Sequence, residues 1–537
     1  MFWTTRSASA AASIVAALLL AGCGGGTDSG TTNTSYNRGS LVYSPPPRVA
    51  PVSAAQFTAL LGASATGSQL LQIAGAPTCG VDVYYFTYGT VGGAAEVTQS
   101  TGAIMVPSGS AAICSGARPL VLYAHGITAN RGFDMADIQN NQESTLVAAI
   151  YAAQGFIVVA PNFAGYDAST LPYYPFSNAD QNSKEMIDAL TAARTALSDG
   201  GLVTTNQGAA RVTDNGKLFV TGYSGGGYVA MATHRAMQAA GIPVTAAAPL
   251  SGQYAIAALG DTLLSGFANL GGTEFAPLLT TSYQKAYGNI YASTTDVYDP
   301  AYATGIDTLL PNVTPFTTLI QQGKVPATAL FESVPPTAPA GSPGTLQGQL
   351  NALTPPTGAP LGALGFGTPG LINNNFRLAY LLDSFANPDG ALATPPTGVP
   401  AAAPQHPLRK AFKLNDLRNW APTRPTLLCG GHLDPTVFYS STQLMTALWS
   451  APSPLALPPG LQTTVDVDST PGANDPYAAA KLGFAQAKAA VAQAAVAAGA
   501  TDGGAQAVFQ AYHGTLVPPF CDAVARGFFQ TVLQLGL

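Results

Sequence analysis

The strongest chemical signal in this 537-residue chain is a serine among glycines, Gly222-Tyr-Ser-Gly-Gly. An apolar run at residues 218–221 precedes the motif, and a stretch with helical spacing at residues 228–240 follows it. A serine on a tight turn between a buried strand and a helix has an exposed oxygen, and the helix amino terminus favours negative charge beside it. Because the chain has 58 glycines, glycine-rich turns are common in it. The predicted strand before this motif and the predicted helix after it are what distinguish it from a chance turn. We predict that Ser224 is a nucleophile.

Five histidines are available as the base that a nucleophilic serine requires. His513, in Ala511-Tyr-His-Gly-Thr, lies late in the chain, before a predicted closing helix at residues 521–535. This place fits the chain order serine, acid, histidine. The other histidines are His125 before the serine motif, His234 within the following helix, His406 in a proline-rich stretch and His432 beside an acid candidate. We predict that His513 is the base, the alternative being a loop histidine without a catalytic role.

The acid is expected on the loop after the next-to-last strand. Residues 426–429, Thr-Leu-Leu-Cys, predict that strand, and Asp434 follows after Gly-Gly-His-Leu. Asp434 would accept the second ring proton of His513 and hold the imidazole in the productive tautomer. The competing acids are Asp416, Asp466 and Asp468. Asp468 is the strongest competitor because it ends a strand-like stretch of its own.

Two backbone amides must stabilise the oxyanion that forms when the serine attacks. Gly225, the residue after the nucleophile, is predicted to supply one. The second is expected from the loop after the apolar run at residues 120–124, where Gly126 and Ile127 are equally suitable. In this interpretation His125 shapes the loop and does not act as a base.

Short apolar runs alternate with helical patterns through most of the chain. The expected strands are residues 81–88, 103–106, 119–124, 156–160, 218–221, 245–250, 426–429 and 463–467, and the expected helices are residues 143–154, 183–198 and 228–240. Continuous apolar runs suit strands buried on both faces of a parallel sheet, and strands that alternate with helices predict an α/β fold. Sites in such folds lie beyond the carboxyl ends of the strands, which is where we expect the chemistry.

The alternation of strands and helices stops between residues 259 and 409. Short helical patterns at residues 262–267 and 376–385 lie among proline- and glycine-rich pieces, and Thr-Pro-Pro-Thr-Gly-x-Pro occurs at both 354 and 394. Two such copies indicate stiffened connections and not a repeat architecture. We predict a core formed by residues 53–258 and 410–537, with residues 259–409 inserted as a cap. The insertion is either a lid over an apolar cleft or structural padding.

The amino terminus has the pattern of a secretory signal over residues 1–22. It has one positive charge, no acid, and an apolar run that ends Leu-Ala-Gly before Cys23, which is short for a membrane span. This ending resembles the lipobox of bacterial lipoproteins, in which the cysteine after the cut carries the lipid. We expect an exported lipoprotein of the outer membrane or cell surface, anchored through Cys23, the alternative being a secreted protein. Residues 23–52, glycine- and proline-rich without a hydrophobic period, predict a flexible tether.

Four further cysteines predict two disulfides in an exported protein, with three possible pairings. Cys79 and Cys114 both belong to the early strands. Cys429 and Cys521 lie close in sequence to the candidate acid and base, so a bond between them would tie the acid loop to the base loop. We favour the pairing of Cys79 with Cys114 and of Cys429 with Cys521. The alternative is a free thiol at Cys429, at the end of a buried strand.

The composition narrows the possible partners. Charged residues make up 9% of the chain, with 21 Lys and Arg against 27 Asp and Glu, and no basic cluster occurs. The chain therefore lacks the charge that holds a phosphate backbone, and we expect no nucleic acid partner.

The serine motif, the cap, Asp434 and His513 together resemble the α/β-hydrolase superfamily, over residues 79–537. Within it, the chain resembles secretory lipases of the Candida antarctica lipase A type and their bacterial relatives. Gly-Tyr-Ser-Gly-Gly and Ala160-Pro-Asn-Phe-Ala-Gly-Tyr, similar to the family's Ala-Pro-Asp-Tyr-x-Gly, carry this resemblance. It implies an α/β-hydrolase fold and hydrolysis of a small-molecule or lipid ester, without a metal or an organic cofactor. The long proline-rich cap departs from the family, so acyl-chain preference does not carry over.

Two other functions remain as alternatives. A serine peptidase resembling the prolyl oligopeptidase group would use the same triad, although the roughly 100 residues before the first central strand are too few for the propeller of those peptidases. A non-catalytic surface lipoprotein could bind hydrophobic compounds under the cap, although an intact triad argues against that interpretation.

Overall fold

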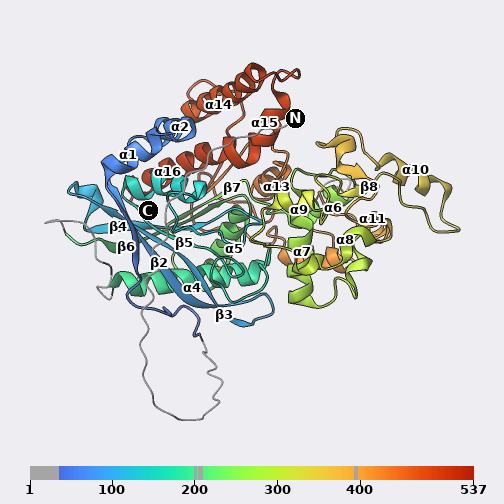
Figure 1. The fold of residues 1–537 in the computed structure, drawn as a ribbon, viewed down its shortest axis with the longest axis horizontal. Coiled ribbons are helices and arrows are strands. Elements are labelled where there is room, and N and C mark those ends of the chain that lie inside the picture. The colour runs from blue at the N-terminus through green and yellow to red at the C-terminus, as the bar shows by residue number, and fades with distance from the viewer. Residues whose placement is uncertain (1–35, 199–201, 203–209, 392–396, 537) are drawn as a thin grey trace, which may run out of the picture. The chain divides into compact units, whose positions relative to one another are not determined.

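The computed structural model describes residues 36–198, 202, 210–391 and 397–536 (Figure 1). The predicted signal peptide and the predicted lipidation residue Cys23 lie outside the described residues. Within the described ranges no helix is both long enough and apolar enough to span a membrane.

A mixed sheet forms the centre of the fold and confirms the predicted α/β class. Its nine strands in the described part of the chain run in the order β1-β2-β3-β5-β4-β6-β7-β10-β11. They are β1 (Arg48–Val52), β2 (Gly80–Val91), β3 (Val97–Ser108), β4 (Ala117–Ala124), β5 (Ile157–Pro161), β6 (Thr213–Tyr223), β7 (Ala246–Leu250), β10 (Thr426–Gly430) and β11 (Gln462–Asp466). β1, β2 and β3 are antiparallel to their neighbours, and the other neighbouring strands are parallel. β5, β7 and β10 are buried along their whole length, which explains their continuous apolar sequence.

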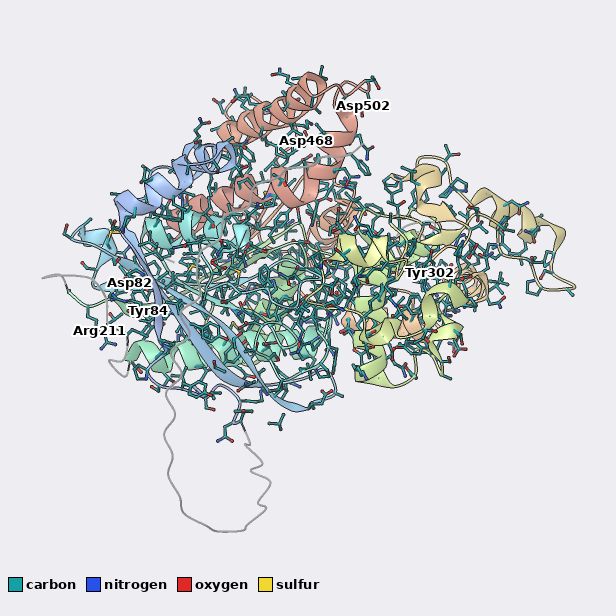
Figure 2. All side chains as sticks on the ribbon, in the orientation of Figure 1. Asp82, Tyr84, Arg211, Tyr302, Asp468 and Asp502 are labelled. Carbon is teal, nitrogen blue, oxygen red and sulfur yellow. A yellow bond between two sulfur atoms is a disulfide. The ribbon has the colours of Figure 1, made fainter. Side chains whose placement is uncertain are left out.

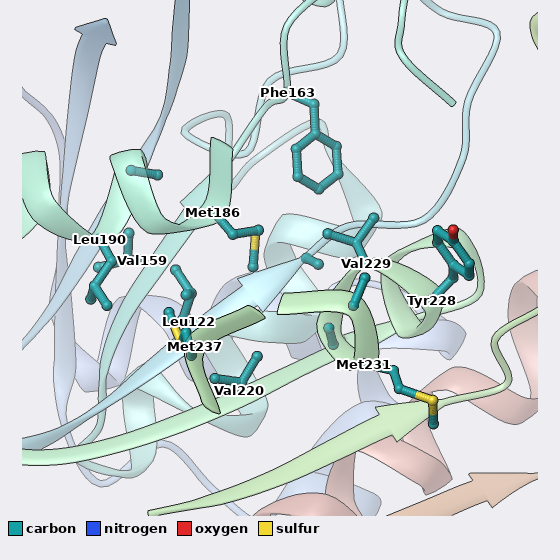
Figure 3. Packing of buried hydrophobic residues seen from close by; sticks show 14 of the residues in the cluster. Leu122, Val159, Phe163, Met186, Leu190, Val220, Tyr228, Val229, Met231 and Met237 are labelled. Carbon is teal, nitrogen blue, oxygen red and sulfur yellow. The ribbon is translucent and has the colours of Figure 1, made fainter. Parts of the chain in front are cut away.

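Helices cover both faces of the sheet. Alternate residues of a strand point to opposite faces, so the apolar side chains on each face pack against a separate layer of helices. Leu122 and Val220 belong to the core shared with α4 (Ala179–Ser198) and α5 (Gly225–Ala239), as Figure 3 shows. Their neighbours Val121 and Phe219 belong to the core shared with α3 (Gln142–Ile150) and α16 (Val517–Gln534). The remaining core helices are α1 (Ala54–Gly62), α2 (Ala65–Ala74), α13 (Ser440–Leu448), α14 (Ala478–Ala497) and α15 (Ala505–Ala511).

The chain between β7 and β10 adds no strand to this sheet within the described residues. It forms α6 (Ile256–Leu264), α7 (Gly272–Tyr287), α8 (Pro300–Ala303), α9 (Phe316–Gln321), α10 (Gly344–Ala352), α11 (Asn374–Ala386), α12 (Pro407–Asn415) and the small pair β8 (Phe331–Glu332) and β9 (Phe366–Gly367). These elements enclose an apolar core of their own. Arg409 of α12 donates to both oxygens of Asp261 of α6, at 2.9 and 2.7 Å. The first and the last of the helices between β7 and β10 are therefore joined by a buried ion pair.

Two segments differ from the sequence-based expectation. The predicted tether includes β1, which pairs antiparallel with β2, and Arg38 and Leu41 form bridges to the same strand. A proline is tolerated on an edge strand because its missing N–H costs no ladder hydrogen bond there, so the proline content concealed this strand. The helix expected at residues 262–267 begins earlier, at Ile256, and ends at Leu264.

Asp522 of α16 gives the fold a predicted pH dependence. Its carboxyl group is fully buried and accepts a hydrogen bond of 2.9 Å from the hydroxyl of Tyr151, and burial raises its pKa from 3.8 to about 8. The folded protein therefore keeps a proton that the unfolded chain loses near pH 4. The contribution of this proton to the free energy of unfolding is fully present below pH 4 and is lost as the pH rises from 4 to about 8. Across that range the free energy of unfolding falls by at most about 1.4 kcal/mol per pH unit.

We expect Asp522→Asn to remove the part of this dependence that lies between pH 7 and 8. Desolvation raises the pKa values of three other carboxyl groups, those of Glu143, Glu185 and Glu274, to about 7. Their contribution to the pH dependence of stability therefore ends at a lower pH than that of Asp522. Urea unfolding of both proteins at pH 5, 7 and 8 measures the effect. An identical slope above pH 7 in the two proteins would show that Asp522 is ionised in the folded state.

Candidate active site

Ser224 lies on the turn between β6 and α5, beyond the carboxyl end of its strand. Its backbone has φ 60° and ψ −125°, a region that costs a non-glycine residue roughly 1–3 kcal/mol. The Ser224 amide donates to the carbonyl of Leu250 at 2.9 Å, which fixes the turn against β7. A Cβ atom at Gly222 or at Gly226 would overlap the carbonyl oxygen of Ala124. The glycines of the motif therefore permit the close approach that presents the serine.

The three predicted residues of the triad form one hydrogen-bonded chain. His513 Nε2 lies 2.7 Å from Ser224 Oγ, and His513 Nδ1 lies 2.6 Å from Asp434 Oδ2. A carboxylate accepts hydrogen bonds, so Nδ1 carries the proton and Nε2 is free to accept the serine proton. The second oxygen of Asp434 accepts from the amides of Thr436 and Val437, at 2.9 and 3.1 Å, which fixes the carboxylate plane.

His513 lies in a π-helical turn, Tyr512–Leu516, between α15 and α16. Such turns widen the backbone locally and are frequent at functional sites. The hydroxyl of Tyr223 donates to the carbonyl oxygen of His513 at 2.7 Å. The residue before the nucleophile therefore holds the backbone of the base in place, a contact that the sequence motif does not reveal.

The three competing acids have other partners. Asp468, labelled in Figure 2, pairs with Lys488 of α14 and accepts from the hydroxyl of Tyr512 at 2.7 Å. Asp466 contacts His432 at 2.8 Å, and Asp416 pairs with Arg418 at 2.8 Å. Asp434 is the acid that the structure brings to His513.

His125 shapes the neighbouring loop. Its ring stacks between Phe133 and Phe163, at centroid distances of 4.3 and 4.4 Å, and its nitrogens face the carbonyl oxygens of Gly126 and Asn162. Burial lowers the pKa of His125 to about 4, against the two carbonyl contacts, which raise it. Burial also lowers the pKa values of His234 and His406 to about 4.

The predicted oxyanion loop requires one correction. The amide of Gly126 donates to Glu143 Oε1 at 2.9 Å, so Gly126 is not available to an oxyanion. The amide of Ile127 is available, because it donates to no backbone acceptor in the described part of the chain. Its nitrogen also lies near Gly225, 3.6 Å from the position that a Cβ atom on Gly225 would occupy. Gly225 begins α5, and the first amides of a helix have no acceptor within that helix. Gly225 and Ile127 are the pair of donors that the geometry favours.

Glu143 is a residue that the sequence reasoning missed. It accepts from the hydroxyl of Tyr123 at 3.0 Å as well as from Gly126, and burial raises its pKa to about 7. In the sequence it is an ordinary acid in the first turn of a helix, where negative charge is common, so no local signal distinguishes it.

Two disulfides, Cys79–Cys114 and Cys429–Cys521, are formed within the described residues, which confirms the favoured pairing. Their Cα–Cα distances are 5.4 and 5.6 Å. The second bond joins the end of β10, which leads to Asp434, to α16, which follows His513. Cys429 is therefore not a free thiol.

We expect loss of the Cys429–Cys521 bond to lower activity more than loss of the Cys79–Cys114 bond. The Cys429–Cys521 bond closes a loop of 92 residues, and the Cys79–Cys114 bond closes one of 35. In the chain-entropy model these loops stabilise the fold by about 4 to 5 and about 4 kcal/mol, so the two losses should lower stability by similar amounts. Only the Cys429–Cys521 bond connects the strand before Asp434 to the helix after His513. The double variants Cys429→Ser/Cys521→Ser and Cys79→Ser/Cys114→Ser, compared by turnover at equal folded fraction, test this. Equal turnover in the two variants would show that the bond acts on stability alone.

Two cavities reach Ser224 within the described residues. The first, here called the His513 cleft, has a volume of about 590 Å³ and is lined by both polar and apolar side chains. It is bordered by α2, the loop after β4 and the turn that carries His513. The second, here called the cap cavity, has a volume of about 110 Å³ and is walled mainly by the apolar side chains Ile256, Leu263, Phe275, Leu279 and Phe412 of α6, α7 and α12. In the described ranges no group of three metal-binding side chains occurs.

Comparisons with known proteins support the fold. No family model and no curated protein matches the chain. Among solved structures, the rice cell wall degrading esterase LipA from Xanthomonas oryzae is 23% identical, with a TM-score of 0.60 over 83% of this chain and 95% of that one. A protein of Legionella pneumophila is 16% identical, with a TM-score of 0.58 over 93% and 99%. Candida antarctica lipase A is 11% identical, with a TM-score of 0.45 over 81% and 78%. The chain has the α/β-hydrolase fold, as predicted.

Proposed function

We propose that this protein is a serine carboxylic-ester hydrolase that acts on a hydrophobic ester through an acyl-enzyme. The observation that carries the proposal is the hydrogen-bonded chain from Ser224 through His513 to Asp434, at 2.7 and 2.6 Å, beside two amides that can meet an oxyanion. The apolar cap cavity adjoining Ser224 supports a hydrophobic substrate. The likeness to LipA supports the fold on which this chemistry is built.

The proposed reaction uses this geometry. Ser224 Oγ attacks the ester carbonyl while His513 Nε2 takes the serine proton, and Asp434 stabilises the imidazolium that results. The amides of Gly225 and Ile127 donate to the tetrahedral oxyanion. Collapse of this intermediate breaks the bond to the alcohol oxygen, which receives the proton from His513. Water then adds to the acyl-enzyme by the same steps, releases the carboxylic acid and restores Ser224.

Hydrolysis of p-nitrophenyl butyrate by the full chain tests the proposal, with aminoacyl and prolyl p-nitroanilides as the amide comparison. We expect turnover of the ester, little or none of the anilides, and labelling of Ser224 by a fluorophosphonate probe. Preference for the anilides would favour a peptidase of the prolyl oligopeptidase type. Folded protein that is neither active nor labelled would favour a non-catalytic binding protein.

We also propose export and lipid attachment at Cys23. The two disulfides of the described residues are typical of proteins in oxidising compartments, and the Leu-Ala-Gly-Cys ending of the signal supports the anchor. We expect the mature chain to begin at Cys23, and Cys23→Ser to release the protein from membranes or leave it unprocessed. Mass spectrometry of the mature amino terminus checks both outcomes. A mature wild-type chain that begins at another residue contradicts the anchor.

A further inference from the structure

Gly126 is not itself an oxyanion donor, but both of its peptide groups are held by side chains. Its amide donates to Glu143 Oε1 at 2.9 Å, and its carbonyl oxygen lies 2.6 Å from Nδ1 of His125. The amide belongs to the peptide group before the Gly126 Cα atom, and the carbonyl belongs to the peptide group after it. The two contacts therefore restrain rotation about both backbone bonds of this residue.

The peptide group after Gly126 carries the proposed oxyanion donor, the N–H of Ile127. A trans peptide group is planar, so its N–H points away from its C=O within one plane. The direction of the Gly126 carbonyl therefore determines the direction of the Ile127 N–H. Because glycine populates a wider range of backbone conformations than other residues, this direction depends on contacts from outside the glycine.

Glu143 is the residue that reaches this loop from another element. Its Oε1 atom also accepts from the hydroxyl of Tyr123, a fully buried residue of β4, at 3.0 Å. Glu143 lies in the first turn of α3, where its own amide donates to the side chain of the N-cap residue Asn141 at 3.0 Å. A central strand and a capped helix end therefore fix the position of the carboxyl group that holds the loop.

The Glu143 carboxyl group also lies close to the turn that carries the nucleophile. A Cβ atom on Gly126 would lie 3.6 Å from Glu143 Oε2 and 3.7 Å from the carbonyl oxygen of Tyr223, the residue before Ser224. Glu143, Ile127 and Ser224 all border the His513 cleft. A loop that moved away from Glu143 would therefore change the position of the Ile127 amide relative to Ser224.

We propose that Glu143 is a positioning residue of the oxyanion site: it holds the amide of Gly126 so that the N–H of Ile127 points at the developing oxyanion. This inference rests on the proposed ester hydrolysis and adds a residue to it. Glu143 acts through the loop and transfers no proton. Loss of its hydrogen bond to Gly126 should therefore weaken binding of the tetrahedral intermediate more than binding of the ester.

Glu143→Leu tests this role in the full-length protein, with p-nitrophenyl butyrate as substrate. We expect kcat to fall by about thirtyfold or more, toward the roughly 10² to 10³ that loss of one oxyanion donor costs. KM should stay within about threefold, since the bond acts in the transition state. An alkyl trifluoromethyl ketone adds to Ser224 as a hemiketal oxyanion, so its inhibition constant should rise as kcat/KM falls.

Glu143→Gln is the conservative variant that separates the hydrogen bond from the rest of the side chain. Its amide oxygen can accept from Gly126 and Tyr123 as the carboxylate does. We expect it to recover about tenfold or more of the kcat that Glu143→Leu loses. A Glu143→Gln variant that is no more active than Glu143→Leu would overturn the proposal.

Glu185 of α4 provides the matched control because its partners are of the same kind. Its Oε1 atom accepts from one backbone amide, that of Ala164 at 2.6 Å, and from one tyrosine hydroxyl, that of Tyr88 at 3.1 Å. It borders neither cavity at Ser224. We expect Glu185→Leu to lower stability as Glu143→Leu does, and to leave kcat and the ketone inhibition constant of the folded protein unchanged.

Tyr123→Phe and Tyr88→Phe give the same comparison with a smaller structural change, also where Glu143→Leu does not fold. Each variant removes one hydroxyl group that donates to a glutamate, Tyr123 to Glu143 and Tyr88 to Glu185. We expect Tyr123→Phe to lower kcat by about three- to tenfold and Tyr88→Phe to leave it unchanged. Thermal unfolding of each variant gives the folded fraction to which kcat is referred.

The outcomes separate this inference from the proposed function. Equal kcat in folded Glu143→Leu and Glu185→Leu refutes the positioning role alone, provided that the wild-type protein hydrolyses the ester. A fall in kcat without a rise in the ketone inhibition constant also refutes it, because the oxyanion site would then be intact. Wild-type protein that shows neither ester turnover nor fluorophosphonate labelling refutes the proposed function together with this inference.

Discussion

Ser224→Ala is expected to lower kcat for p-nitrophenyl butyrate by roughly 10⁵ to 10⁶, with the fold intact. The substitution removes only Oγ, whose hydrogen bond of 2.7 Å to His513 Nε2 belongs to the reaction and not to the core. Alanine keeps the strained backbone at φ 60°, so stability changes little. Thermal unfolding and turnover, measured on the same preparation, separate the two effects.

His513→Ala provides the companion measurement. Triad members act as a unit, so we expect its kcat to lie within about tenfold of that of Ser224→Ala, and the double variant to lose little more. Additive losses in the double variant would mean that the two residues do not share one step. Residual activity near the wild-type value in Ser224→Ala would place the nucleophile elsewhere.

The central strands could be predicted from the sequence because burial on both faces leaves a continuous apolar run. β5, β7 and β10 are such strands, and their positions differ from the expected ranges by at most one residue. β1 could not be predicted, because an edge strand has no such run and its Pro51 indicates a loop. Most of the helices between β7 and β10 were also missed, since they are short and pack against one another in a core that no periodic pattern reveals.

The candidate site was predictable where geometry restricts the residue type. The close approach of Ala124 to the serine turn requires glycine at Gly222 and Gly226, so the motif is visible in the sequence. Glu143 and Tyr223 were missed because their roles come from tertiary contacts, one to an amide and one to a carbonyl group. Neither residue type distinguishes such a position in the sequence.

The choice between Gly126 and Ile127 as oxyanion donor also depends on a tertiary contact and could not be made from the sequence. Both amides follow β4 in the sequence, and only the position of Glu143 on α3 removes Gly126. The choice among the acids is similar, because Asp434 and Asp468 both follow a strand late in the chain. Partners distant in sequence separate them, since Lys488 and Tyr512 contact Asp468, whereas His513 contacts Asp434.

Asp434→Asn is expected to lower kcat by roughly 10³ to 10⁴, whereas Asp468→Asn should cost less than about tenfold. An asparagine beside His513 can present its N–H₂ group to Nδ1, which then accepts a hydrogen bond and leaves the proton on Nε2. A ring in that tautomer cannot accept the proton of Ser224, so the geometry survives while the base is lost.

Asp468→Asn is the matched control because it makes the same change at an acid with comparable burial. It weakens the ion pair with Lys488 and the hydrogen bond of 2.7 Å from Tyr512, the residue before His513, so its effect on turnover is indirect. Folded fraction at the assay temperature must be measured for both variants, because each substitution weakens the hydrogen bonds of a buried carboxylate. If Asp468→Asn proves the more damaging to kcat in folded protein, the acid is Asp468, and the contact of 2.6 Å between Asp434 and His513 has another role. The expected ranking follows from which carboxylate determines the tautomer of the base.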